Sequence, residues 1–178
     1  MYNLTEGLKT SVKVGGVSYP VNTDFRVWLK ISELMEDSTP ENIAKAIILC
    51  YRGGFFPPSL DDAVAGLVQF INGEDVEKSR GKGKKVMDFQ KDSALIFASF
   101  LYDFGIDLTE CDMHWHKFLM LLKNLSQASP LMRVVQIRSM KTDDIQDRKK
   151  RDEIIRLKRA YALEDPGAED LDRLWEMM

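Results

Sequence analysis

Cys111, His114 and His116 form the one cluster of metal-ligating residue types in the sequence. A zinc site needs four such ligands in a tetrahedron, usually supplied as closely spaced pairs. On a helix, residues 111 and 114 share a face while residue 116 points elsewhere, and no second pair completes the set. We therefore interpret Cys111 as a small buried hydrophobe and the histidines as neighbours of a buried Trp115, and expect no metal and no cofactor.

A nucleophilic catalytic set is also missing from the sequence. A serine or cysteine nucleophile needs a base beside it, and both histidines lie in this single segment. Cys50 lies in the apolar run 47–51, where burial raises a thiol pKa and suppresses its reactivity. Carboxylate pairs such as Asp61–Asp62 stand at helix starts, where solvated carboxylates are favourable without any catalytic role. We predict that the protein is not an enzyme.

The strongest local charge feature is the basic segment 148–159. Asp152 and Glu153 interrupt it, and Ile154 and Ile155 give it an apolar side. This pattern favours a helix that packs on its own domain or on an acidic partner over one that reads nucleic acid. Its candidate interaction residues are Arg148, Arg151, Arg156 and Arg159.

Two short alternating runs predict an N-terminal β-hairpin over residues 11–21. Val12 and Val14 precede Gly15–Gly16, and the glycines supply the positive φ angles of a two-residue turn. Pro20 cannot donate to a ladder, which places its strand at an edge.

Helical spacing follows from Asp24 onward. Thr39–Pro40 provides an N-cap and first-turn proline for a second helix, and Ser59 and Asp62 have capping-box spacing for a third. The apolar face expected for that third helix consists of Leu60, Val64, Leu67, Val68 and Ile71.

Residues 74–86 show no apolar periodicity, and we expect an exposed, mobile, basic connection between two helical halves. The following run 94–104 is apolar on nearly every side, which predicts a buried helix at the centre of the fold. Gly105 and Ile106 then predict a Schellman ending. Thr109–Asp112 has capping-box spacing for the next helix, so a helix hairpin is expected. A further helix is predicted from about residue 144 to 162.

Composition is that of an ordinary globular protein. The chain has 178 residues, 44% hydrophobic and 30% charged, with a formal net charge of -3. No signal peptide or membrane span is evident, and the two cysteines fit a reducing compartment, so we expect a cytoplasmic protein. The predicted fold is mainly α: a compact multi-helix domain over residues 1–165 with an acidic C-terminal tail, 166–178.

Five stretches of the chain together resemble a family of tailed-phage and prophage proteins: Tyr19–Arg26, Tyr102–Leu108, His114–Phe118, Ile137–Met140 and Leu157–Leu163. This family is regarded as tail-assembly chaperones, encoded between the major tail protein and the tape measure protein. We call the following the family-motif residues: Asp24, Phe25, Tyr102, Gly105, Ile106, Asp107, Leu108, His114, Trp115, Phe118, Arg138, Met140 and Tyr161. The family's usual Trp-Trp pair after the histidine is replaced by Trp115–His116.

The resemblance implies a protein that binds the long helical tape measure protein, keeps it soluble, helps tail-tube subunits assemble around it, and stays out of the virion. It would act in the host cytoplasm, with the major tail protein as a further partner and no catalytic residues. Self-association is a corollary, and the hairpin edge and Leu171, Leu174 and Trp175 are candidate contacts. The alternatives are a structural tail or head-completion component and a nucleic-acid-binding regulator.

Overall fold

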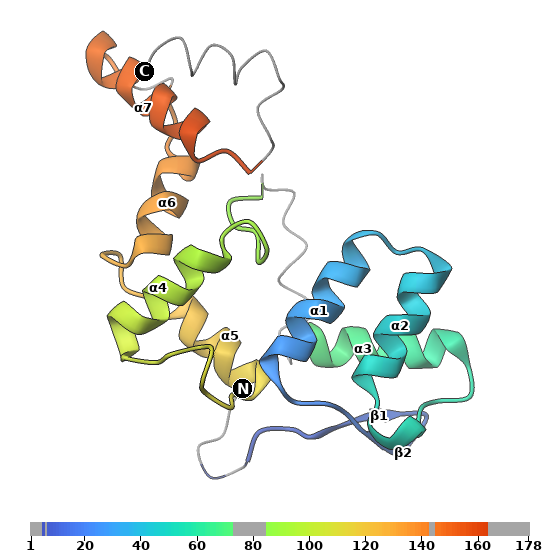
Figure 1. Ribbon diagram of the computed structural model, residues 1–178. Coiled ribbons are helices and arrows are strands. Elements are labelled where there is room, and N and C mark those ends of the chain that lie inside the picture. Colours follow the sequence, from blue (N-terminus) through green and yellow to red (C-terminus); the bar gives the residue numbers. More distant parts are fainter. Residues whose placement is uncertain (1–4, 6, 73–84, 143–144, 164–178) are drawn as a thin grey trace. The chain divides into compact units, whose positions relative to one another are not determined.

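The computed structural model describes residues 5, 7–72, 85–142 and 145–163 and is mainly helical (Figure 1). In these residues, seven α-helices follow an N-terminal β-hairpin, so the predicted fold class is confirmed. The chain divides into two compact units: unit 1 is Met1–Lys82 with Thr109–Asn124, and unit 2 is Gly83–Leu108 with Leu125–Met178. The single domain expected over residues 1–165 stays a prediction.

The hairpin of unit 1 forms where the sequence predicts it. Strands β1 (Ser11–Val14) and β2 (Val17–Pro20) pair antiparallel, with Val14 opposite Val17. Gly15 and Gly16 have φ angles of 56° and 82°. Two consecutive positive φ angles are what a two-residue hairpin turn of type I′ requires, and glycine adopts them without strain at both positions.

Four α-helices complete unit 1: α1 (Phe25–Glu36), α2 (Pro40–Cys50), α3 (Leu60–Asn72) and α5 (Trp115–Lys123), with a 3-10 turn, η1 (Arg52–Gly54), after α2. The predicted caps of α2 and α3 are confirmed. The Thr39 hydroxyl accepts from the Asn42 backbone N–H at 3.3 Å, and the Ser59 hydroxyl accepts from that of Asp62 at 3.5 Å. These bonds satisfy donors that have no partner inside the helix.

The buried face of α3 differs from the predicted one. Of the five residues expected to share its apolar face, only Leu67 is buried, and Leu60 is 61% exposed. The buried residues are Ala63, Gly66, Leu67 and Phe70. Small residues decide this orientation, because a Cβ at position 66 would lie 2.3 Å from the Tyr51 hydroxyl. The helix therefore turns its small face toward β1 and Tyr51.

Unit 2 contains α4 (Ser93–Phe104), α6 (Pro130–Ser139) and α7 (Arg148–Ala160). Helix α6 packs against both α4 and α7. The left-handed glycine cap predicted at the end of α4 is confirmed, since Gly105 has a φ of 64°. The Gly105 N–H donates to the Leu101 carbonyl at 3.1 Å, which is the bond of an αL ending, and the Ile106 N–H donates to the Phe100 carbonyl at 3.3 Å instead of making the predicted Schellman bond to Leu101.

Helix α4 is less buried than its composition suggests. Ile96, Ser99 and Phe100 are buried, but Leu101 is 49% exposed and Tyr102 is 62% exposed. The prediction of a helix buried on every side was wrong, because α4 packs mainly along one face, against α6. Most of the largest fully buried side chains, including Trp28, Trp115 and Phe118, belong to unit 1.

Two helices begin later than predicted. Helix α5 begins at Trp115, after His114, and the expected cap at Thr109–Asp112 is not used. Helix α7 begins at Arg148, because the Asp147 carboxylate accepts from the backbone N–H groups of residues 149 and 150. Helix α5 packs on α1 within unit 1, and α4 packs on α6 within unit 2. The helix hairpin expected from α4 and α5 stays a prediction.

Candidate functional site

The family-motif residues of unit 1 form an aromatic core. The rings of Phe25 and Phe118 stack with their centroids 5.0 Å apart, and Trp115 lies 5.7 Å from Phe118. Trp28 extends the stack, 6.3 Å from Trp115 and 4.7 Å from Phe70. All five side chains are at most 3% exposed. These residues therefore hold unit 1 together and offer no surface to a ligand.

Asp24 and His114 start the two helices that carry this core. They pair as an isolated antiparallel bridge, in which the Trp115 N–H donates to the Thr23 carbonyl at 2.7 Å. Each also caps the helix that follows it. The Asp24 carboxylate accepts from the Arg26 N–H at 2.8 Å, and His114 Nδ1 accepts from the His116 N–H at 3.1 Å. One bridge therefore sets the starts of α1 and α5 side by side.

The histidines and Cys50 have structural environments, whereas Cys111, which was expected to be buried, is half-buried. His114 Nε2 lies 2.9 Å from the Lys9 carbonyl, and His116 Nε2 lies 2.7 Å from the Phe70 carbonyl. Burial lowers the pKa of His114 and raises that of the Cys50 thiol to about 12, as the apolar setting of Cys50 predicts. Among the described residues, no three His, Cys, Asp or Glu side chains are placed to hold a metal ion.

In unit 2, Arg138 connects three segments of the chain. Its guanidinium donates to both Asp92 carboxylate oxygens, at 2.7 and 2.8 Å, and to the Val86 carbonyl at 3.0 Å. Its Nε donates to the Tyr161 carbonyl at 2.5 Å. The Met140 carbonyl accepts from Lys158 Nζ at 2.5 Å. Three family-motif residues therefore join the ends of α6 and α7.

The sequence did not single out Asp92, although it is 2% exposed and pairs with Arg138. The two residues are separated by 46 positions, and no local pattern links them. Burial of the pair follows from the packing of α4 on α6. An aspartate just before the apolar run 94–104 is the only signal, and it fits an ordinary helix start equally well.

The remaining predicted residues are spread along the chain. Tyr102 is exposed on α4, Leu108 is buried, and Ile106 and Asp107 are half-buried. On α7, Arg148, Arg156 and Arg159 are exposed and Arg151 is half-buried. Leu171, Leu174 and Trp175, with the rest of the predicted tail, lie outside the described residues, as does most of the predicted connection 74–86.

An exposed apolar surface on unit 1, which we call the aromatic patch, consists of Val17, Phe55 and Phe56. These residues are 46%, 53% and 48% exposed. Phe55 stacks on Tyr19 at 5.0 Å, and Val17 lies on the same strand face as Tyr19. Tyr51 joins the set, with its ring 6.2 Å from Tyr19 and 6.5 Å from Phe56. The sequence analysis did not single out this patch, and two adjacent phenylalanines after Gly53–Gly54 are the one local feature that marks it.

The family described as Bacteriophage Gp15 protein matches residues 4–163 of the chain. The chain belongs to this family. The prediction of a bacteriophage protein is thereby confirmed, and the match covers every helix and strand of the Gp15-family protein that the structure describes. Comparison with curated proteins found no match, nor did comparison with solved structures. None of the helices in the described residues has the length and apolar character of a membrane span.

Proposed function

We propose that this Gp15-family protein is a non-catalytic tail-assembly chaperone. It binds the tape measure protein, keeps that long helical client soluble, and assists assembly of the tail tube around it. It acts as a homo-oligomer in the cytoplasm of the bacterial host, contacts the major tail protein, and is left out of the virion. The order of the family-motif residues from Asp24 to Tyr161 supports this role, because the resemblance to tail-assembly chaperones rests on them.

The aromatic patch is the observation that carries the proposal. Large apolar side chains exposed together are a feature of surfaces that bind other proteins. An amphipathic helix binds by laying its apolar stripe on such a surface, and aromatic residues are enriched at the centre of such contacts. Phe55 and Phe56 follow η1 directly in the chain, and about half of each side chain is exposed beside the hairpin. A helical client can therefore cover them without any rearrangement of the core.

Structural roles for the chemistry-bearing residues support a role without catalysis. His114 caps α5, and His116 contacts a backbone carbonyl. Arg138 donates hydrogen bonds to Asp92 and to two backbone carbonyls. Cys50 is fully buried and its raised pKa keeps it in the thiol form. Each of these groups stabilises the fold in its present position.

Co-expression with the tape measure protein tests the proposal. The Phe55→Ser/Phe56→Ser double variant should reduce the amount of client that co-purifies by about 10-fold, since removing a hot-spot residue commonly costs 2 kcal/mol or more. Leu101→Ser is the control, because it removes an apolar side chain of unit 2 that is 49% exposed and is not a family-motif residue. Thermal unfolding of each variant shows that its fold is retained. If the wild-type protein neither co-purifies with the client nor changes its solubility, the proposed function is wrong.

Two measurements separate the alternatives. Mass spectrometry of purified particles should find the protein absent or far below stoichiometric amounts, whereas a structural tail or head-completion component would be present in fixed copy number. Titration with DNA and RNA at low salt should show no binding. A salt-sensitive association would favour the nucleic-acid-binding regulator instead.

A further inference from the structure

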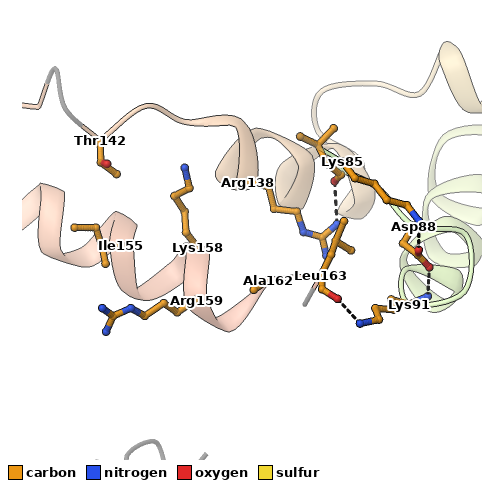
Figure 2. A pocket seen from close by; sticks show the side chains of 11 residues that line it. Lys85, Asp88, Lys91, Arg138, Thr142, Ile155, Lys158, Arg159, Ala162 and Leu163 are labelled. Atoms are coloured by element: carbon orange, nitrogen blue, oxygen red, sulfur yellow. Dashed lines mark hydrogen bonds and ion pairs between the residues drawn. The ribbon is translucent and has the colours of Figure 1, made fainter. Parts of the chain in front are cut away.

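Unit 2 contains a pocket of about 590 Å³ that the proposed function does not use. Its walls come from the segment before α4, from the end of α6, and from the last two turns of α7 (Figure 2). Figure 2 shows Lys158 pointing from α7 toward the segment that carries Thr142, while Lys91 reaches the main chain of Leu163. Leu163, the last residue that the structure describes, lines this pocket.

The pocket has an excess of positive charge. Arg138 is neutralised by Asp92, and Lys85 by Asp88 at 2.6 Å. The hydrogen bond from Lys85 helps to lower the pKa of Asp88 to about 2, so that this carboxylate is ionised and already engaged. The remaining cations in the lining are Lys91, Lys158 and Arg159.

No carboxylate among the described residues neutralises these three cations. Lys91 donates to the Leu163 carbonyl and Lys158 to the Met140 carbonyl, and a carbonyl satisfies a donor without cancelling its charge. The rest of the lining includes the apolar side chains of Val86, Ile155 and Leu163. A ligand that fits this lining combines carboxylates with large apolar groups. A nucleic-acid backbone would leave the apolar side chains uncovered.

The sequence that continues from Leu163 has this chemistry. Residues 164–178 contain six carboxylates and a single arginine, together with Leu171, Leu174 and Trp175. The described chain ends in the pocket wall, so this segment is tethered at the site, which raises its local concentration there. We propose that the pocket binds residues 164–178 of the same chain, with their carboxylates on the three cations and their apolar side chains on the apolar lining.

Bound in this way, the segment competes with any acidic partner for the pocket. While it occupies the pocket, Leu171, Leu174 and Trp175 are covered by their own chain. An acidic partner that binds the pocket more tightly releases them for contact with another protein. The contact between charges is screened by salt, so release also increases with ionic strength.

A fluorescently labelled peptide of residues 164–178 tests the proposal by anisotropy. The receptors are the full-length wild-type protein and a full-length variant in which the six carboxylates of the segment are replaced by amides. The peptide should bind the amide variant at least about 10-fold more tightly, because the wild-type segment competes for the same pocket. A peptide with amides in place of its carboxylates is the control. Equal affinity for both receptors, or equal binding of both peptides, overturns the proposal.

Charge reversal then locates the binding site. In the amide variant, Lys158→Glu/Arg159→Glu should weaken peptide binding by about 10-fold or more, as expected for loss of two charge contacts. Lys149→Glu/Arg156→Glu makes the same change of charge on the same helix, outside the pocket, and should weaken binding less than about 2-fold. Arg159→Glu alone serves if the double variant unfolds, because Arg159 is exposed and makes no ion pair among the described residues. An equal loss of peptide affinity in both double variants would mean that the peptide is attracted to the positive charge of α7 in general. That result would contradict binding in the pocket.

Zero-length carbodiimide cross-linking of the wild-type chain identifies the source of the segment. Links should join Lys91 or Lys158 to carboxylates of residues 164–178. In a mixture of isotope-labelled and unlabelled protein, these links should connect residues of one and the same chain. Mixed links would assign the pocket to the segment of a second copy and contradict the proposal.

Discussion

The guanidinium of Arg138 contacts the carboxylate of Asp92 through two nitrogen atoms, at 2.7 and 2.8 Å, in the interior of unit 2. The side chain of Arg138 is 10% exposed and that of Asp92 is 2% exposed. Two parallel hydrogen bonds of this kind fix the relative orientation of the two groups as well as their separation. The pair therefore sets how the end of α6 meets the start of α4.

Replacing Arg138 with alanine should strongly destabilise the protein. It leaves the buried Asp92 carboxylate without its counter-charge, which costs roughly 3 to 5 kcal/mol of the free energy of unfolding. Urea denaturation measures this loss. Arg148→Ala is the control, because that side chain is 87% exposed and lies 3.9 Å from Asp152, a geometry worth less than about 1 kcal/mol. Similar losses for both variants would contradict the role assigned to the buried pair.

Gly66→Ala should destabilise unit 1 even though alanine favours helices. The new methyl group would lie 2.3 Å from the Tyr51 hydroxyl and 3.0 Å from a Val14 methyl group. Overpacking of this kind costs roughly 1 to 3 kcal/mol, against a gain in helix propensity of up to about 1 kcal/mol. Adding Tyr51→Phe removes the closest contact and should recover part of the loss in a double-mutant cycle. Strictly additive effects would show that the clash is relieved in another way.

Gly105→Ala should cost about 1 kcal/mol for a different reason. No atom lies within 4 Å of a Cβ at this position, but its φ of 64° is left-handed, where an alanine is strained. Gly7→Ala is a matched control, since Gly7 has the same open surroundings and no positive φ. Thermal unfolding should show a lower midpoint for Gly105→Ala alone.

His114 should make stability depend on pH below its ordinary pKa. Burial lowers the pKa of folded His114 below the usual value of 6.5, so the unfolded chain binds more protons as the pH falls through this range. The contribution of His114 is complete above pH 6.5 and is lost as the pH falls toward the folded-state pKa. Protonation also removes the Nδ1 acceptor that caps α5.

Denaturation of the wild type and of His114→Asn from pH 7.5 to 5.5 measures this effect. Asparagine can cap a helix but does not titrate in this range. The wild type should lose stability relative to the variant as the pH falls, and contributions of all other groups cancel in the difference. A difference that stays constant over the range would contradict the role given to His114.

Local features of the fold could be predicted because a few neighbouring residues encode them. Gly15–Gly16 fixes the hairpin turn, Thr39–Pro40 starts α2, and Gly105–Ile106 ends α4. The predicted start of α5 was wrong because a distant partner intervenes. His114 is held in an extended bridge to Asp24, which delays α5 past the capping sequence at 109–112.

The candidate surfaces were less predictable than the elements. The basic character of α7 is visible in its sequence, but its pocket depends on Lys91 and Arg138 from other segments. Phe55 and Phe56 resemble core residues by type, and only the packing of Tyr19 and Tyr51 beneath them leaves them exposed.

The sequence by itself determined the helical class, the turns and most caps, and the residues that place the chain in its bacteriophage family. Tertiary structure alone decided which faces are buried, that Asp92 neutralises Arg138, and that residues 109–124 join the first part of the chain in one compact unit. The physical reason is the separation along the chain of the groups that interact. Turns and caps are satisfied by atoms a few residues away, whereas burial and ion pairing depend on segments that meet only when the whole chain has folded.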